Sequence, residues 1–242
     1  MNFTKLSQIV MVPGLLSTDA VYQAQVDALA GRAIISETRL DDDITSMARR
    51  LLVAAPERFI LCGHSMGGYV ALEVVRLAPE RVEALALVGT SAKADTAEQT
   101  KRRHALVAMA KERGIDAVAR LLNDKLFATN PEISSDHRTG LEQLSLAMAI
   151  EIGTQTFARQ QAAIVTRRDQ TGMLAAITVP TVVVSGTEDQ IIPLERSEEM
   201  ASAIPGAELI RLEGVGHMIP IEAPHALSAA LLNLGTRLAA SG

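Results

Sequence analysis

The chain has little of what would tie it to a membrane, an oxidising compartment or a nucleic acid. Its 242 residues contain one cysteine, Cys62, so no internal disulfide can form and we expect a reducing, cytoplasmic setting. No uncharged apolar run approaches the roughly 20 residues that span a bilayer, and the first residues do not have the pattern of a signal peptide. The formal net charge is −5, with Lys and Arg scattered, which gives nucleic-acid binding little electrostatic support.

Aromatic side chains are also scarce, with four Phe, two Tyr and no Trp. Any apolar pocket is therefore expected to be lined mostly by aliphatic and Met side chains. Cys62 lies in an apolar, strand-like run, which favours plain core packing over redox chemistry. No cluster of His, Cys and carboxylates has the spacing of metal ligands, so we expect neither a metal nor another cofactor.

The most informative stretch is an apolar run that leads into Gly63-His64-Ser65-Met66-Gly67. The two glycines leave room for a serine in a strained backbone conformation. This is the pattern of a nucleophile elbow, in which a strand ends, a helix begins and the serine hydroxyl stands at the edge of a sheet. A glycine-rich turn with a surface serine fits the same five residues. The motif alone therefore leaves a catalytic role for Ser65 open.

Strand-like and helix-like segments alternate at both ends of the chain. The expected strands are residues 8–12, 32–37, 58–62, 84–88, 181–185 and 208–212. The expected helices are residues 21–29, 44–54 with Asp43 as N-cap, 66–78, 194–203 and a closing helix opened by Pro224. Such alternation with short connections predicts a parallel sheet that is covered by helices on both faces.

Between residues 96 and 168 the alternation gives way to a helical pattern. Breaks are expected near Gly114, Asn130-Pro131, Gly140 and Gly153. Two apolar stripes predict packing faces, and they consist of Ile115, Val118, Leu122 and Leu126, and of Leu141, Leu144, Met148 and Ile152. We expect residues 93–169 to form a helical cap over one edge of a core made of residues 1–92 and 170–242. Met148 is the cap residue predicted to contact a substrate.

A serine hydroxyl becomes a good nucleophile only with a neutral histidine to take its proton and an acid to orient that histidine. Asp189 follows the strand at 181–185, and His217 follows the strand that ends at Leu212. Because the carboxyl ends of parallel strands meet at one edge of a sheet, we expect both loops to lie near Ser65. The order Ser65, Asp189, His217 is also the order found in α/β-hydrolases.

On these residues the chain resembles the α/β-hydrolase superfamily, and within it small bacterial carboxylesterase-like hydrolases. The resemblance covers essentially the whole chain and is most specific in residues 63–68, 180–189 and 214–217. It implies that Ser65 is the nucleophile, His217 the general base and then acid, and Asp189 the orienting carboxylate. It also implies an α/β-hydrolase fold with a helical cap after the fourth strand. Since only 12 residues precede Pro13, we expect six parallel strands, without the first two of the usual eight.

The resemblance further implies two backbone N–H donors for a developing oxyanion. One is that of Met66, directly after the serine and at a helix N-terminus. The other is that of Leu15, in the loop after the first strand. Many relatives carry a histidine where this chain has Pro13, which alters the support of that loop.

Other polar residues near these motifs offer alternative assignments. Glu188 neighbours Asp189 and is a second candidate for the acid. His64 is expected to have a structural role, because the elbow points its side chain away from the hydroxyl. The remaining histidines, His104, His137 and His225, are expected at the surface.

The implied activity is that of a serine hydrolase acting through an acyl-enzyme on Ser65. Its substrate would be a small to medium, rather apolar carboxylic ester, and a small molecule is the only partner expected. Alternatives that use the same triad are hydrolysis of a thioester, amide or carbon–carbon bond, and acyl transfer. A different class of function is a non-catalytic protein that keeps the fold as a ligand pocket. The natural substrate and the oligomeric state are left open.

Overall fold

A computed structural model describes residues 7–129 and 135–241. Its centre is a six-stranded sheet in the order β2-β1-β3-β4-β5-β6, in which every neighbouring pair is parallel. The strands are β1 (Ile9–Val12), β2 (Ala33–Ile35), β3 (Phe59–His64), β4 (Val82–Val88), β5 (Thr181–Gly186) and β6 (Glu208–Leu212). The predicted six-stranded parallel sheet is thus confirmed.

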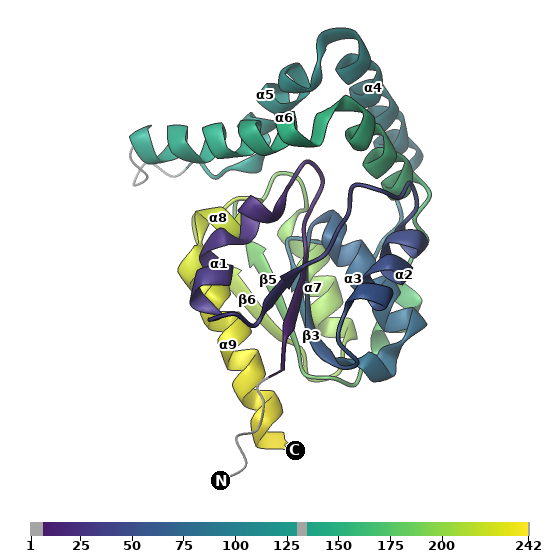
Figure 1. The fold of residues 1–242 in the computed structure, drawn as a ribbon, viewed down its shortest axis with the longest axis vertical. Coiled ribbons are helices and arrows are strands. Elements are labelled where there is room, and N and C mark those ends of the chain that lie inside the picture. The colour runs from purple at the N-terminus through teal and green to yellow at the C-terminus, as the bar shows by residue number, and fades with distance from the viewer. Residues whose placement is uncertain (1–6, 130–134, 242) are drawn as a thin grey trace.

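Helices cover both faces of this sheet (Figure 1). On one face lie α1 (Gln23–Ala28), α8 (Ile219–Glu222) and α9 (Pro224–Ser241), and on the other α2 (Ile44–Ala54), α3 (Met66–Leu77) and α7 (Leu194–Ala203). Short 3-10 segments lie before α1, before β4 and before β5, at Asp19–Tyr22, Pro79–Arg81 and Thr171–Ala176. The first of these segments overlaps the start of the helix predicted at residues 21–29. The other two and α8 were not predicted, because pieces of one or two turns carry no clear period.

The central strands are buried on both faces, which explains their continuous apolar sequence. All six residues of β3 are buried, and residues 59–62 alternate between two hydrophobic clusters. Leu61 packs with the helices α2, α3 and α7, whereas Ile60 and Cys62 pack with the α1 and α9 side. Cys62 is a core residue, and burial raises the pKa of its thiol to about 12. The predicted packing role of this cysteine is therefore confirmed.

A helical cap follows β4 and lies across one end of the molecule, over the sheet (Figure 1). It consists of α4 (Ala97–Arg113), α5 (Ile115–Leu126) and α6 (Ser135–Val165). Thr96 starts α4 through a capping box: its hydroxyl accepts a hydrogen bond from the Gln99 backbone, and the Gln99 side chain accepts one from the Thr96 backbone.

The predicted breaks within the cap have different outcomes. Gly114, at φ 88°, separates α4 from α5, and Gly153, at φ 71°, kinks α6. Gly140 lies inside α6 without a break, so that prediction was wrong. Asn130 and Pro131 lie outside the described residues. Within the parts of the chain that are described, no helix is long and apolar enough to cross a membrane.

Candidate active site

Ser65 occupies the tight turn between β3 and α3, with φ 53° and ψ −117°. This is a strained conformation for a residue with a side chain. The turn exists because its flanking glycines permit very close packing. A Cβ atom on Gly63 would lie 2.3 Å from the carbonyl oxygen of Gly67, and one on Gly67 would lie 2.0 Å from that of Val12. The two glycines therefore let α3 press against β1 and β3 and present the serine at the sheet edge.

The structure brings Ser65, Asp189 and His217 into one hydrogen-bonded chain. His217 Nε2 lies 2.9 Å from Ser65 Oγ, and His217 Nδ1 lies 2.7 Å from Asp189 Oδ2. The three residues follow β3, β5 and β6. They lie close together because the carboxyl ends of these parallel strands meet at the same edge of the sheet. Because the Asp189 carboxylate can only accept a hydrogen bond, His217 Nδ1 must be the donor and carry the proton of the neutral ring. The lone pair of Nε2 then faces the Ser65 hydroxyl.

The Asp189 carboxylate is held in place from its other side. Its Oδ1 accepts hydrogen bonds from the backbone N–H groups of Ile191 and Ile192, each at 2.8 Å. Asp189 and His217 are also buried, at 8% and 3% exposure. Burial and fixed donors keep both side chains in one orientation.

Glu222, which sequence reasoning missed, holds the loop that carries His217. Its carboxylate accepts hydrogen bonds from the backbone N–H groups on both sides of the histidine, that of Gly216 at 3.2 Å and that of Met218 at 3.0 Å. It also accepts the N–H of Ala128, just after the cap helix α5, at 2.9 Å. Burial raises the pKa of Glu222, although these three donors oppose the shift. The only signal in the sequence was an acid a few residues after the histidine.

The rival assignments are separated by their contacts. Glu188 accepts a hydrogen bond from the Thr129 backbone at 2.9 Å, whereas Asp189 contacts His217. His64 is buried, and its Nε2 donates to the carbonyl oxygen of His217 at 2.9 Å. Burial, and next the neighbouring His217, lower the pKa of His64 to about 3, so it stays neutral at ordinary pH. The other histidines are exposed, and they are His104, His137 and His225.

Two backbone segments flank the serine where oxyanion donors were predicted. Met66 is the first residue of α3, and the first N–H groups of a helix have no acceptor within it. The loop with Leu15 passes directly beside the elbow, since a Cβ on Gly14 would lie 3.1 Å from the Cβ of Ser65. This loop is held from the cap: the buried Gln160 side chain accepts the Leu16 N–H at 3.2 Å and donates to the Thr38 carbonyl at 3.3 Å.

A cavity of about 250 Å³ lies between the elbow, the Leu15 loop and the cap. Its apolar lining is mostly aliphatic, as expected, and includes Leu15, Leu16, Leu106, Leu122, Leu126 and Met218. Arginine side chains and Asp95 line the cavity too, which was not predicted from the sequence. Met148 is buried in a core cluster with Phe127, and Ser145 and Ala149 of the same helix line the cavity instead.

These groups can perform acyl transfer: a hydroxyl beside a neutral imidazole, a carboxylate behind it, and backbone N–H groups near the reacting position. In the described segments of the chain, no group of three or more His, Cys, Asp or Glu residues could hold a metal ion.

Comparison with known proteins shows the fold family of the chain. A family model for the alpha/beta hydrolase fold matches residues 42–224. A Pseudomonas savastanoi protein named as the carbamate hydrolase RutD is 27% identical over 202 residues, covering 80% of this chain and 75% of its own.

Two solved structures share the fold. A thermophilic esterase from Thermogutta terrifontis, solved with malate bound, has a TM-score of 0.86 at 23% identity and covers 96% of this chain and 90% of its own. The enol-lactonase of Burkholderia xenovorans LB400 has a TM-score of 0.82 at 21% identity and covers 95% and 92%. Since the family model spans most of the sequence, from the start of α2 to the beginning of α9, the chain belongs to the α/β-hydrolase fold family.

Proposed function

We propose that the protein is a serine hydrolase that cleaves small carboxylic esters through an acyl-enzyme on Ser65. The observation that carries this proposal is the continuous chain from Ser65 Oγ through the His217 ring to Asp189, with contacts of 2.9 and 2.7 Å. The cavity volume of about 250 Å³ favours a small ester, and its aliphatic walls favour an apolar group close to the serine.

In the first half of the reaction, His217 Nε2 takes the hydroxyl proton as Ser65 Oγ attacks the ester carbonyl carbon. The carbonyl oxygen becomes an oxyanion, which accepts hydrogen bonds from the N–H groups of Leu15 and Met66. The C–O bond to the alcohol then breaks, and His217 returns the proton to the leaving oxygen. In the second half, water takes the place of the alcohol, and the acid leaves with Ser65 restored.

Hydrolysis of a carbamate is a second candidate, favoured by the names of the curated relatives. The two substrates undergo the same attack on a carbonyl carbon, and for the same alcohol they share the leaving group and differ only in the substituent on the carbonyl. Turnover of p-nitrophenyl acetate and p-nitrophenyl carbamate under the same conditions therefore ranks them directly.

The main test compares wild type with Ser65→Ala on p-nitrophenyl acetate and with a fluorophosphonate probe. We expect kcat to fall by about 10⁴ or more and labelling to disappear. Ser145→Ala is the matched control, because Ser145 lines the same cavity but has no histidine partner among the described residues. It should keep the label. Equal turnover by wild type and Ser65→Ala would exclude the mechanism, and wild type that takes no label would indicate a non-catalytic binding protein.

A further inference from the structure

The cavity beside Ser65 carries an excess of positive charge. Five cationic side chains and one carboxylate line it, and they are Lys93, Arg102, Arg103, Arg167, Arg196 and Asp95. The chain as a whole has a formal net charge of −5. The cavity therefore has a charge opposite in sign to that of the whole protein. Such a cavity attracts anionic ligands, because its low-dielectric walls focus the electric field.

The cations differ in how far they are neutralised. Lys93 and Arg196 both pair with Glu199, at 2.8 and 2.9 Å. Arg103 and Arg167 share the single carboxylate of Asp95. Arg102 makes no ion pair with any residue in the described parts of the chain. Each of these two pairs of cations therefore keeps one net positive charge. Because Arg102 adds a further positive charge beside Arg103 and Arg167, the larger share of the excess lies on these three arginines, which we call the arginine cluster.

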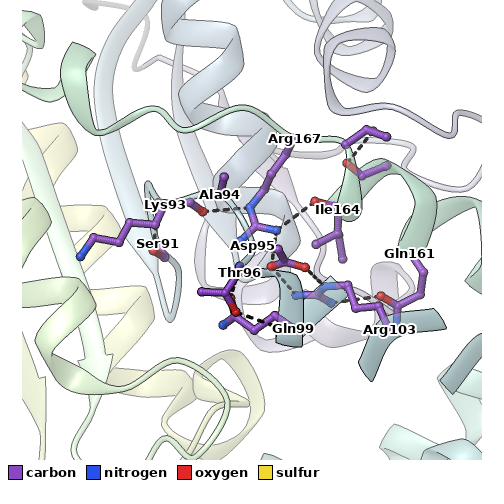
Figure 2. A network of polar contacts seen from close by, with 12 residues as sticks. Ser91, Lys93, Ala94, Asp95, Thr96, Gln99, Arg103, Gln161, Ile164 and Arg167 are labelled. Atoms are coloured by element: carbon purple, nitrogen blue, oxygen red, sulfur yellow. Dashed lines mark hydrogen bonds and ion pairs between the residues drawn. The ribbon is translucent and has the colours of Figure 1, made fainter. Parts of the chain in front are cut away.

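Asp95 holds two members of this cluster, Arg103 and Arg167, without cancelling the charge of both (Figure 2). Its side chain is 1% exposed. It accepts hydrogen bonds from Nε and Nη2 of Arg103, and from Nη1 of Arg167 at 2.7 Å. Burial alone would raise the pKa of Asp95, but the two guanidinium groups lower it below its usual value, so the carboxylate is charged. One negative charge thus fixes two positive ones, and a net positive charge is left facing the cavity.

The surroundings of the cluster offer further donors to a ligand. Gln161 lines the cavity, and its Oε1 accepts a hydrogen bond from Arg103 Nη1 at 3.0 Å (Figure 2). Its buried Nε2 has no hydrogen-bond partner among the described residues. A buried amide without an acceptor is costly, and a ligand oxygen would relieve that cost. The Arg167 guanidinium lies 4.2 Å from the centre of the Tyr69 ring, which also holds it in place.

We propose that the arginine cluster binds a free carboxylate of the substrate, and that the enzyme therefore prefers esters which carry such a carboxylate over neutral esters of the same size. This proposal rests on the serine hydrolase assignment and adds a substrate class to it. Guanidinium groups suit this task because their forked N–H groups match the two oxygens of a carboxylate. Since Arg102 is the member without an ion-pair partner, it is the group that meets the incoming charge.

A purely structural role makes different predictions. The Asp95 network also joins the segments that enter and leave the cap, because Arg167 Nε donates to the Lys93 carbonyl at 3.1 Å. If joining these segments were its whole role, changes in the cluster would alter stability and would affect charged and neutral esters equally. The ratio between the two substrates separates the two roles.

The test uses monomethyl succinate and methyl butyrate, which differ mainly in a carboxylate that replaces a methyl group. Acid release at constant pH gives kcat/KM for each. We expect wild type to prefer monomethyl succinate by about 10-fold or more, and Arg102→Gln to lower that ratio by about 10- to 100-fold. Arg120→Gln is the matched control: Arg120 is an exposed arginine on the cap helix α5 that does not line the cavity, so the ratio should stay as in wild type.

A binding measurement separates this proposal from the catalytic one. Monomethyl succinate is titrated by calorimetry into Ser65→Ala and into Ser65→Ala with Arg102→Gln. Binding by the first protein and a loss of at least tenfold in the second support the carboxylate site even if no ester is turned over. Turnover of both esters at similar rates, or a ratio that Arg102→Gln changes by less than threefold, would overturn it while leaving the serine mechanism intact.

Discussion

The two ends of the cavity are built in opposite ways. At the sheet edge, Ser65, Asp189 and His217 follow three different strands, and backbone N–H groups hold their loops. At the other end, Arg102 and Arg103 lie on the helix α4, and Arg167 lies where the chain leaves the cap. The acidic side chains described at the sheet edge are those of Glu188, Asp189 and the partly buried Glu222, whereas the arginine cluster carries an excess of positive charge.

The difference shows which part of the molecule is constrained by the fold. Parallel strands all end at one edge, so their loops meet wherever this sheet forms, and the reacting groups are positioned by the backbone. The arginine cluster depends on side chains of an inserted helix and its linkers. Those side chains can be exchanged without disturbing the strands, so substrate preference can change while the reaction is kept.

The largest effect is expected from Asp189→Asn at the sheet edge. The side-chain oxygen of the asparagine would keep the hydrogen bonds from the N–H groups of Ile191 and Ile192. The NH₂ group of the asparagine would face His217 Nδ1. The imidazole proton would then move to Nε2 and point at Ser65, so the base would be lost. We expect kcat on p-nitrophenyl acetate to fall by about 10⁴ with little change in stability.

The neighbouring acid supplies the control for this change. Glu188→Gln alters a residue that contacts Thr129 and not the histidine, so kcat should fall by less than tenfold. A greater loss in Glu188→Gln than in Asp189→Asn would reverse the assignment of the acid.

A smaller effect is expected where the cap reaches down to the sheet edge. Gln160→Met keeps the size of the side chain but removes the bonds to the Leu16 N–H and the Thr38 carbonyl. The loop with Leu15 would then be free to move, and a misplaced oxyanion donor should lower kcat by about 10- to 100-fold. Gln155→Met, at an exposed position of the same helix, should leave kcat unchanged. If Gln160→Met also has the kcat of wild type, the loop holds itself and the two ends of the cavity are independent.

The same contrast explains what was predictable from the sequence. The site at the sheet edge could be predicted from local signals in the sequence. Apolar runs indicate the strands, Asp43 indicates the start of a helix, and loops that follow parallel strands are expected to meet at one edge of the sheet. Asp43 does cap α2, with its Oδ1 accepting the Ser46 N–H at 2.8 Å. Each of these signals lies within a few residues, and the parallel sheet supplies the rest.

The cap end could not be predicted in this way. Asp95 and Arg167 are 72 residues apart, and no period within either segment reveals that they pair. The stripe on α6 was correct as a packing face, but Met148 packs with Phe127 toward the core while Ile152 packs in a separate cap cluster. A helical period shows that a face is buried and does not show whether it faces a core or a cavity. That choice is made by tertiary packing.

The smallest effect is the pH dependence of stability that His64 contributes at the sheet edge. Folded His64 has a pKa lowered to about 3, whereas an unfolded histidine binds a proton at about 6.5. The unfolded state therefore binds more protons as pH falls below 6.5, and His64 makes the free energy of unfolding fall by up to about 1.4 kcal/mol per pH unit.

Urea unfolding at pH 7.5 and 5.0 measures this contribution, which is about 2 kcal/mol over that interval. His64→Gln should show a loss of stability smaller by that amount. Glu222 has a raised pKa and acts in the opposite sense, because its folded state binds the proton more tightly, but wild type and variant share it and the subtraction removes it. His225→Gln changes an exposed histidine and should behave as wild type. An unchanged pH dependence in His64→Gln would mean that His64 binds a proton equally well in the folded and unfolded states, and the buried, neutral state inferred for His64 would no longer hold.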